Sequence, residues 1–269
     1  MRYWRQFLGT LAALALIYPA VLYCGQKHLY LFPDRGYVSP AAVGLGDIFE
    51  EKVFTATDGL KIMGWYAKGE TDKPAILFFH GNSGQIAKFA PSLKPYIDSG
   101  YTVFMSEYRG FGGTAGDFTQ ENLYADAKAA FDFLHNRLGH KDIIVYGYSM
   151  GTAAASVVAA ECPALGLVLA APFYSLKKVA GEQYIPLATF MLKYELPSYQ
   201  FIKKYTKPLL IVHGAEDTLI APQHGKDLFD LSPATDKQLV FIPKQSHNAL
   251  FFGDKAHPVV TEWLARHEK

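Results

Sequence analysis

Residues 145–156 read VYGYSMGTAAAS, and this stretch restricts the fold of the chain more than any other. A β-branched run, typical of a strand, ends in Gly147-Tyr148-Ser149-Met150-Gly151, and small residues with a helical pattern follow at once. A G-x-S-x-G motif at such a junction presents its serine on a sharp turn between a buried strand and a helix. The alternative is a helix N-cap serine in a turn that only requires glycines. The rest of the chain decides between the two.

Short apolar runs alternate with amphipathic segments along the whole chain. Asp58-Gly59 separates the first two predicted strands, as expected for a hairpin. Strands that alternate with helices predict an α/β fold, with a mostly parallel sheet covered by helices on both faces. In such sheets, functional sites lie at the carboxyl ends of the strands. The predicted strands are 52–56, 60–67, 75–79, 102–106, 143–146, 165–170, 209–212 and 239–242, and the helices are 85–99, 120–138, 153–160, 222–231 and 257–266.

Composition narrows the class of protein. The chain has 269 residues, of which 50% are hydrophobic, enough for one large domain at 26–269. A net charge of +1 without a basic stripe argues against a nucleic-acid partner. Cys24 and Cys162 are too far apart in sequence to suggest a disulfide framework or a zinc site. We therefore expect no metal and no cofactor.

The N-terminus differs from the rest. Residues 7–24 carry no charge, and 18 residues span about 27 Å as a helix, close to the thickness of a bilayer. Arg2 and Arg5 precede the run, which favours a cytoplasmic N-terminus. The sequence therefore predicts a single-pass membrane anchor, with the catalytic domain on the non-cytoplasmic side.

Three alternatives to the anchor fit the N-terminal sequence less well. A cleaved signal peptide needs small residues at its cleavage site, where Tyr18 is bulky. A lipoprotein would be modified at Cys24, but the tyrosine before it is large for the usual pattern. A buried core helix fits poorly with an unpatterned apolar run at the start of the chain. We assign residues 1–25 to the anchor.

A nucleophilic serine needs a base, and the base needs an orienting acid. After a serine on such a turn, the acid and then the histidine follow at the ends of later strands. The strand at 209–212 leads to Asp217 and its neighbour Glu216, and we favour Asp217 because the turn can direct its side chain back over the sheet. The next strand leads to His247. The predicted triad is Ser149, Asp217 and His247.

Two amides are predicted to stabilise an oxyanion. The backbone N–H of Met150, at the start of a helix, points to where negative charge would develop. The loop after the strand at 75–79 reads His80-Gly81-Asn82-Ser83-Gly84, and the amide of Asn82 is the best second donor.

These motifs together resemble the α/β-hydrolase superfamily, and specifically a membrane-anchored branch of it. The matching stretches run in order from residue 26 to 248: QKHLYLFPD, FFHGNSG, SEYRGFGG, YGYSMG, APFYSL, HGAED and SHN. The resemblance implies the same triad and the same two oxyanion donors. Relatives of this kind include lysophospholipases, protein depalmitoylases, esterases of small esters and some aminopeptidases, so the chemistry is better defined than the substrate.

Residues 173–207 form the only insertion long enough for a cap. An aromatic lid over the serine would suit an apolar acyl chain, while amphipathic helices packed on the domain are an equally good interpretation. His80, Phe173 and Tyr174 are candidate substrate-binding residues. Arg109 is either a substrate contact or part of a glycine-rich turn. The insertion holds Phe173, Tyr174, Tyr184, Phe190, Met191, Tyr194, Tyr199 and Phe201.

The sequence thus predicts a serine hydrolase that cleaves ester or thioester bonds of an apolar acyl substrate through an acyl-enzyme. A serine peptidase is the alternative within the same chemistry. A non-catalytic, membrane-anchored binding module is the alternative outside it, although such a module would not need all three triad residues. The acyl group, the leaving group and the oligomeric state stay open.

Overall fold

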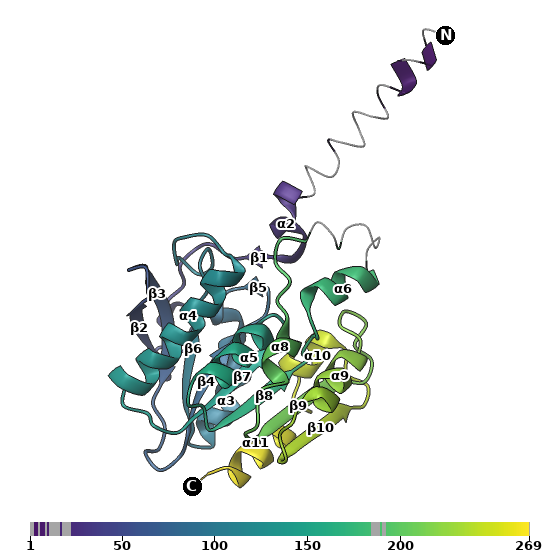
Figure 1. Ribbon diagram of the computed structural model, residues 1–269. Helices are drawn as coiled ribbons and strands as arrows, with labels where there is room; N and C mark the ends of the chain where they lie inside the picture. Colours follow the sequence, from purple (N-terminus) through teal and green to yellow (C-terminus); the bar gives the residue numbers. More distant parts are fainter. Residues whose placement is uncertain are drawn as a thin grey trace.

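The computed structural model describes residues 3–4, 6–8, 10, 17, 23–183, 189 and 192–268. Within them, an eight-stranded sheet has the order β10-β9-β8-β7-β4-β6-β3-β2 (Figure 1). Neighbours from β10 to β6 pair in parallel, whereas β3 pairs antiparallel with both β6 and β2. The strands are β2 (Glu50–Thr55), β3 (Lys61–Ala67), β4 (Ala75–Phe79), β6 (Thr102–Ser106), β7 (Ile143–Tyr148), β8 (Gly166–Ala170), β9 (Leu209–Gly214) and β10 (Lys237–Ile242).

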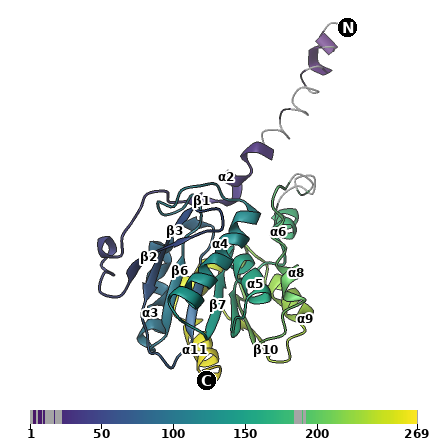
Figure 2. The same ribbon diagram turned by 60° about the vertical axis from the view of Figure 1, so that its left-hand side comes forward.

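Helices cover both faces of the sheet (Figure 2). Buried residues of α3, α10 and α11 join the hydrophobic cluster on one face, and those of α4, α5, α8 and α9 join the cluster on the other. The predicted α/β arrangement is therefore confirmed. The helices are α3 (Ile86–Asp98), α4 (Gln120–Asp132), α5 (Gly151–Glu161), α8 (Ser198–Ile202), α9 (Gln223–Leu231), α10 (His247–Phe252) and α11 (His257–Arg266), and a π-helical turn (Phe133–Arg137) follows α4.

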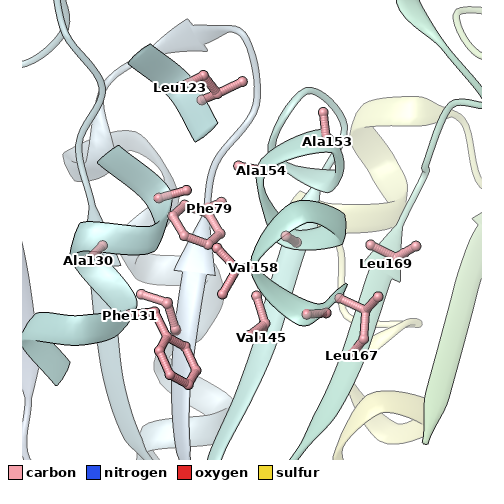
Figure 3. Packing of buried hydrophobic residues seen from close by; sticks show 14 of the residues in the cluster. Phe79, Leu123, Ala130, Phe131, Val145, Ala153, Ala154, Val158, Leu167 and Leu169 are labelled. Carbon is pink, nitrogen blue, oxygen red and sulfur yellow. The ribbon is translucent and has the colours of Figure 1, made fainter. Parts of the chain in front are cut away.

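Successive side chains of the central strands point to opposite faces, as the pleat of a strand requires. In β4, Leu77 and Phe79 enter one cluster, while Ile76 and Phe78 enter the other. Figure 3 shows Phe79 in one hydrophobic cluster with residues from α4, α5, β7 and β8. Because both faces are covered, the strand reads as a continuous apolar run in the sequence.

Shorter elements lie near the carboxyl ends of the parallel strands. The two-residue strand β1 pairs with β5 directly after β4, and the helix α2 precedes β1. The helix α6 follows β8, above the sheet in Figure 1. These elements are α2 (Lys27–Tyr30), β1 (Phe32–Pro33), β5 (Ser83–Gly84) and α6 (Leu176–Gln183); a 3-10 helix (Ala41–Val43) lies between β1 and β2.

The predicted anchor at residues 7–24 lies mostly outside the described residues, Tyr18 included. In the part of the chain that the structure describes, no helix has both the length and the apolar character needed to cross a bilayer. The anchor therefore stays a prediction.

Candidate active site

Ser149 lies on a sharp turn between β7 and α5. Its backbone has φ = 53°, in the left-handed region that non-glycine residues rarely adopt. The turn is held by the Ser149 N–H, which donates to the Ala170 carbonyl at 2.9 Å, and by Thr152, whose N–H and hydroxyl both donate to the Ser149 carbonyl. This strained position aims the serine side chain off the carboxyl edge of the sheet.

Both glycines of the motif are required by close backbone contacts. A Cβ atom on Gly151 would lie 2.0 Å from the carbonyl oxygen of Phe79, and one on Gly147 would lie 2.5 Å from the carbonyl oxygen of Gly151. Neither distance is tolerable, because the obstructing atoms are backbone. The glycines therefore let the helix start directly against the neighbouring strand.

The structure brings the three predicted triad residues together. His247, the first residue of α10, places Nε2 at 2.9 Å from Oγ of Ser149 and Nδ1 at 2.7 Å from Oδ2 of Asp217. All three side chains are buried, with 4–6% of each residue exposed. A carboxylate can only accept, so Nδ1 carries a proton and Nε2 of a neutral His247 is free to accept the serine proton. Glu216 is exposed, as expected.

Three hydrogen bonds fix the Asp217 carboxylate, and His213 lies beside it. Oδ1 accepts from the backbone N–H groups of Leu219 and Ile220 at 2.9 and 2.8 Å, while Oδ2 accepts from His247 and lies 3.3 Å from Nε2 of His213. Burial alone would raise the pKa of the carboxyl, but the interactions with His213 and His247 outweigh it and hold the pKa below its usual range. Asp217 is therefore ionised at neutral pH.

His213 is a residue that sequence reasoning missed. It lies near the end of β9, just before the turn that holds Asp217, and it is fully buried. Its Nε2 donates to the Ile220 carbonyl at 2.9 Å and lies 3.3 Å from Oδ2 of Asp217. The only sequence signal was a histidine beside Gly214 at the end of a strand, which by itself indicates no partner.

The loop after β4 lies against the nucleophile. A Cβ atom on Gly81 would lie 3.6 Å from Cβ of Ser149 and 3.3 Å from the Tyr148 ring. In the part of the chain that is described, neither the backbone N–H of Asn82 nor that of Met150 donates to a hydrogen bond. Both backbone N–H groups are therefore free to donate, and their role towards an oxyanion stays a prediction.

The other polar groups of Asn82 are occupied by the N-terminal segment. Its side-chain amide donates to the Tyr30 carbonyl at 2.7 Å, and its own carbonyl accepts from the N–H of Phe32 at 2.9 Å. Residues 30–32 therefore brace the loop from outside.

His80, a candidate substrate-binding residue, has no exposed surface in this structure. It is fully buried behind the loop, and its ring nitrogens are hydrogen-bonded to the Gly81 carbonyl and to Glu107. With no exposed surface and both nitrogens occupied, the side chain supports the loop from behind.

The described aromatic residues of the 173–207 segment pack on the domain. Phe173 is buried in the same cluster as Met150, and the Tyr174 ring stacks on Tyr199 with centroids 4.6 Å apart. Tyr194 packs edge-on against Phe118, and Phe201 against Tyr124. Tyr184, Phe190 and Met191 lie outside the described residues. The interpretation as packed helices thus fits the described part of the segment, and substrate contacts of Phe173 and Tyr174 stay a prediction.

Arg109 is part of a structural ion-pair cluster. Its guanidinium pairs with the carboxylates of Asp126 and Asp58, in both cases at 2.6 Å, and only 7% of the residue is exposed. Because its charge is already neutralised, the glycine-rich turn is the better interpretation of this motif.

No group of three or more His, Cys, Asp or Glu side chains is arranged to hold a metal ion among the residues described.

Comparison with known proteins identifies the family and agrees with the fold. A sequence model of the family described as serine aminopeptidase, S33, matches residues 70–201 and 200–254. An uncharacterized protein of Mycobacterium tuberculosis is 30% identical over 90% of this chain and 88% of its own length. An uncharacterized membrane protein of Saccharomyces cerevisiae is 27% identical over 97% and 96%. Among solved structures, an esterase of Pyrococcus furiosus superposes with a TM-score of 0.71 at 20% identity, covering 88% of this chain and 96% of that one, which shows the same fold.

Proposed function

Because the chain belongs to the serine aminopeptidase family of the α/β-hydrolase superfamily, we propose that it is a serine hydrolase acting on carboxylic esters or thioesters of apolar acyl groups. The observation that carries the proposal is the continuous hydrogen-bond relay from Ser149 through His247 to Asp217, with distances of 2.9 and 2.7 Å. A serine hydroxyl is a weak nucleophile, and this relay supplies the base that activates it.

The reaction follows from the relay. Oγ of Ser149 attacks the acyl carbon while Nε2 of His247 takes its proton, and Asp217 stabilises the imidazolium that forms. The carbonyl oxygen becomes negative and accepts from the amides of Asn82 and Met150. The imidazolium then gives its proton to the departing alcohol or thiol, leaving an acyl-serine. A water molecule, deprotonated by His247, hydrolyses the acyl-serine and restores the free hydroxyl.

The proposed substrate has an apolar acyl group. Met150, the residue after Ser149, and Phe173, in the segment after β8, are buried members of one hydrophobic cluster. The apolar character of these two residues supports an apolar acyl group. A peptidase is the second candidate, because the matched family is described as aminopeptidases and the same relay can attack an amide.

Covalent labelling tests the proposal. A fluorophosphonate should label the wild-type protein, and Ser149→Ala should abolish labelling and lower ester hydrolysis by at least about 10³-fold, since triad members act as a unit. Ser232→Ala is the matched control: it removes a buried hydroxyl at the end of α9 and should leave labelling intact.

Three results would contradict the proposal. Undiminished labelling of a folded Ser149→Ala protein would exclude Ser149 as the nucleophile. Absence of labelling and of hydrolysis across a chain-length series of p-nitrophenyl esters and acyl-CoA thioesters would favour a binding module. Faster cleavage of aminoacyl anilides than of every ester would favour the peptidase.

A further inference from the structure

His80 lies fully buried directly behind the loop that carries Asn82. Its Nδ1 is 2.7 Å from the carbonyl oxygen of Gly81, and its Nε2 is 2.7 Å from Oε1 of Glu107, which is also fully buried. The contact with Glu107 joins the loops that follow two neighbouring strands, β4 and β6.

The proton on Nδ1 follows from its partner. A carbonyl oxygen can only accept, so Nδ1 must donate to Gly81. Glu107 holds the ring in this orientation and is itself held by backbone donors. Its Oε1 also accepts from the N–H of Tyr108, and its Oε2 accepts from the N–H of Ile86, both at 3.0 Å.

The hydrogen bond from His80 to Gly81 fixes the orientation of the whole peptide group between Gly81 and Asn82. The carbonyl of Gly81 and the N–H of Asn82 belong to one planar trans peptide, in which they point in opposite directions. Because the carbonyl of Gly81 points to His80, the N–H of Asn82 must point to the opposite side of the peptide, away from His80. The loop itself lies within van der Waals range of the nucleophile, since a Cβ atom on Gly81 would be 3.6 Å from Cβ of Ser149.

We propose that His80, buttressed by Glu107, is a positioning residue that sets the orientation of the Gly81–Asn82 peptide and thereby aims the second oxyanion donor. This inference rests on the proposed function, because an oxyanion forms only if Ser149 attacks an acyl carbon. His80 acts through the peptide and makes no contact with substrate.

Two substitutions distinguish the roles of the two ring nitrogens of His80. The side-chain amide of asparagine reaches the position of Nδ1, so His80→Asn can still donate to Gly81 but loses the contact with Glu107. The longer glutamine reaches the position of Nε2, so His80→Gln can still pair with Glu107 but leaves the Gly81 carbonyl without its donor. His140→Gln is the matched control, because His140 is bonded to Tyr66 and precedes β7 at the opposite edge of the sheet.

The readout is the separation of kcat from KM on one short ester. His80→Gln should lower kcat by about 10- to 100-fold with KM within about threefold, because an oxyanion donor acts on the transition state and its outright removal costs about 10²- to 10³-fold. His80→Asn should keep kcat within about fivefold of the wild type while lowering Tm, because the buried Glu107 loses a partner. His140→Gln should leave kcat unchanged.

The outcomes distinguish this inference from the proposed function. A wild-type protein without Ser149-dependent hydrolysis would overturn both. A wild-type protein that hydrolyses the ester, with His80→Gln equally active at temperatures below its Tm, would overturn the positioning role alone. A loss of kcat in His80→Asn as large as that in His80→Gln would likewise overturn the positioning role.

A measurement on the wild-type protein covers the case in which His80→Gln fails to fold. Nitrogen-15 NMR of histidine-labelled protein should show a protonated Nδ1 on His80 at neutral pH, whatever the activity of the sample. A ring with a bare Nδ1 would overturn the proposal, because no hydrogen bond to the Gly81 carbonyl could then exist.

Discussion

At the scale of single residues, burial and hydrogen bonding have opposite effects on the pKa of Asp217, the carboxylate that orients His247. Burial opposes its negative charge, yet two backbone N–H groups and His247 donate to the carboxylate, His213 lies 3.3 Å from it, and these interactions hold its pKa below the usual range. The carboxylate thus keeps His247 in one tautomer. Glu216, one residue earlier in the same turn, is exposed and has no such role.

Substitution of the two acids should therefore have very different effects. Asp217→Asn keeps the size of the side chain but can present an N–H to Nδ1, which favours the wrong tautomer of His247; we expect kcat to fall by about 10⁴-fold, as for the corresponding change in serine proteases. Glu216→Gln should stay within about twofold of the wild type. Steady-state kinetics on one short ester measures both effects. A large loss of kcat in Glu216→Gln, with Asp217→Asn at the wild-type rate, would show that Glu216 and not Asp217 orients His247.

The triad residues could be predicted because each of them follows a strand, and the apolar composition of these strands can be recognised in the sequence. Ser149 stands in a recognisable turn, and the acid and base follow the next strand ends in a fixed order. His80 and His213 could not be assigned in this way. The hydrogen-bond partners of these histidines are determined by tertiary contacts. A histidine next to a glycine does not indicate in the sequence that it forms a buried hydrogen bond with Glu107, 27 residues later.

At the scale of elements, the predicted strands at 75–79 and 102–106 coincide with β4 and β6, because turn residues bound short apolar runs on both sides. The predicted helix at 120–138 ends earlier, since α4 passes into a π-helical turn at Phe133. The pair β1–β5 was not predicted. Its two residues per strand carry no pattern, and the pairing joins segments 51 residues apart, Phe32 with Ser83.

The attachment of α6 to α9 depends on a buried histidine. His224 is fully buried on α9; its Nδ1 accepts from the Tyr174 N–H at 3.1 Å and its Nε2 donates to Glu182 of α6 at 2.8 Å. Burial lowers the pKa of His224 below 6.5, although Glu182 opposes the shift. Between pH 6.5 and the lower pKa of the folded state, His224 is protonated in the unfolded chain but neutral in the folded chain. The free energy of unfolding therefore falls as the pH is lowered through this range.

Acid should therefore weaken the wild-type protein more than His224→Asn. Asparagine can still accept from the Tyr174 N–H but does not titrate. The free energy of unfolding, measured by urea denaturation from pH 7 to pH 5, should fall more in the wild type than in the variant. His140 and His257, whose pKa values burial also lowers, titrate equally in both proteins and cancel in the comparison. Equal pH dependence in the two proteins would refute the assignment.

At the scale of the whole molecule, the described N-terminal residues enter the domain beside the proposed active site. Figure 1 shows α2 and β1 next to β5, and Figure 2 shows α2 and β1 at the same end of the molecule. The Tyr30 carbonyl and the Phe32 N–H hold Asn82, and Lys27 pairs with Asp117 at 2.6 Å. Residues 27–32 therefore lie at the edge of the sheet that carries the Asn82 loop.

We propose that residues 7–24 cross a bilayer and leave the catalytic domain on the non-cytoplasmic side, with its catalytic edge near the membrane surface. The uncharged run after Arg2 and Arg5 supports this, and a relative from yeast is named a membrane protein. The full-length protein should resist carbonate extraction, and protease added to the non-cytoplasmic side should cleave the domain.

A charge in the middle of the run gives the sharpest test of that topology. Leu14→Arg should release protein into the carbonate wash, because arginine at the centre of a spanning helix costs about 2.5–3.5 kcal/mol on insertion. Gln6→Arg, which adds the same charge before the run, should stay in the membrane and even reinforce the orientation set by the two arginines. Release of both variants together with the wild type, or a mature N-terminus near Gly25, would show that no anchor is retained. Protection of the domain from outside protease would instead reverse the orientation and leave the anchor in place.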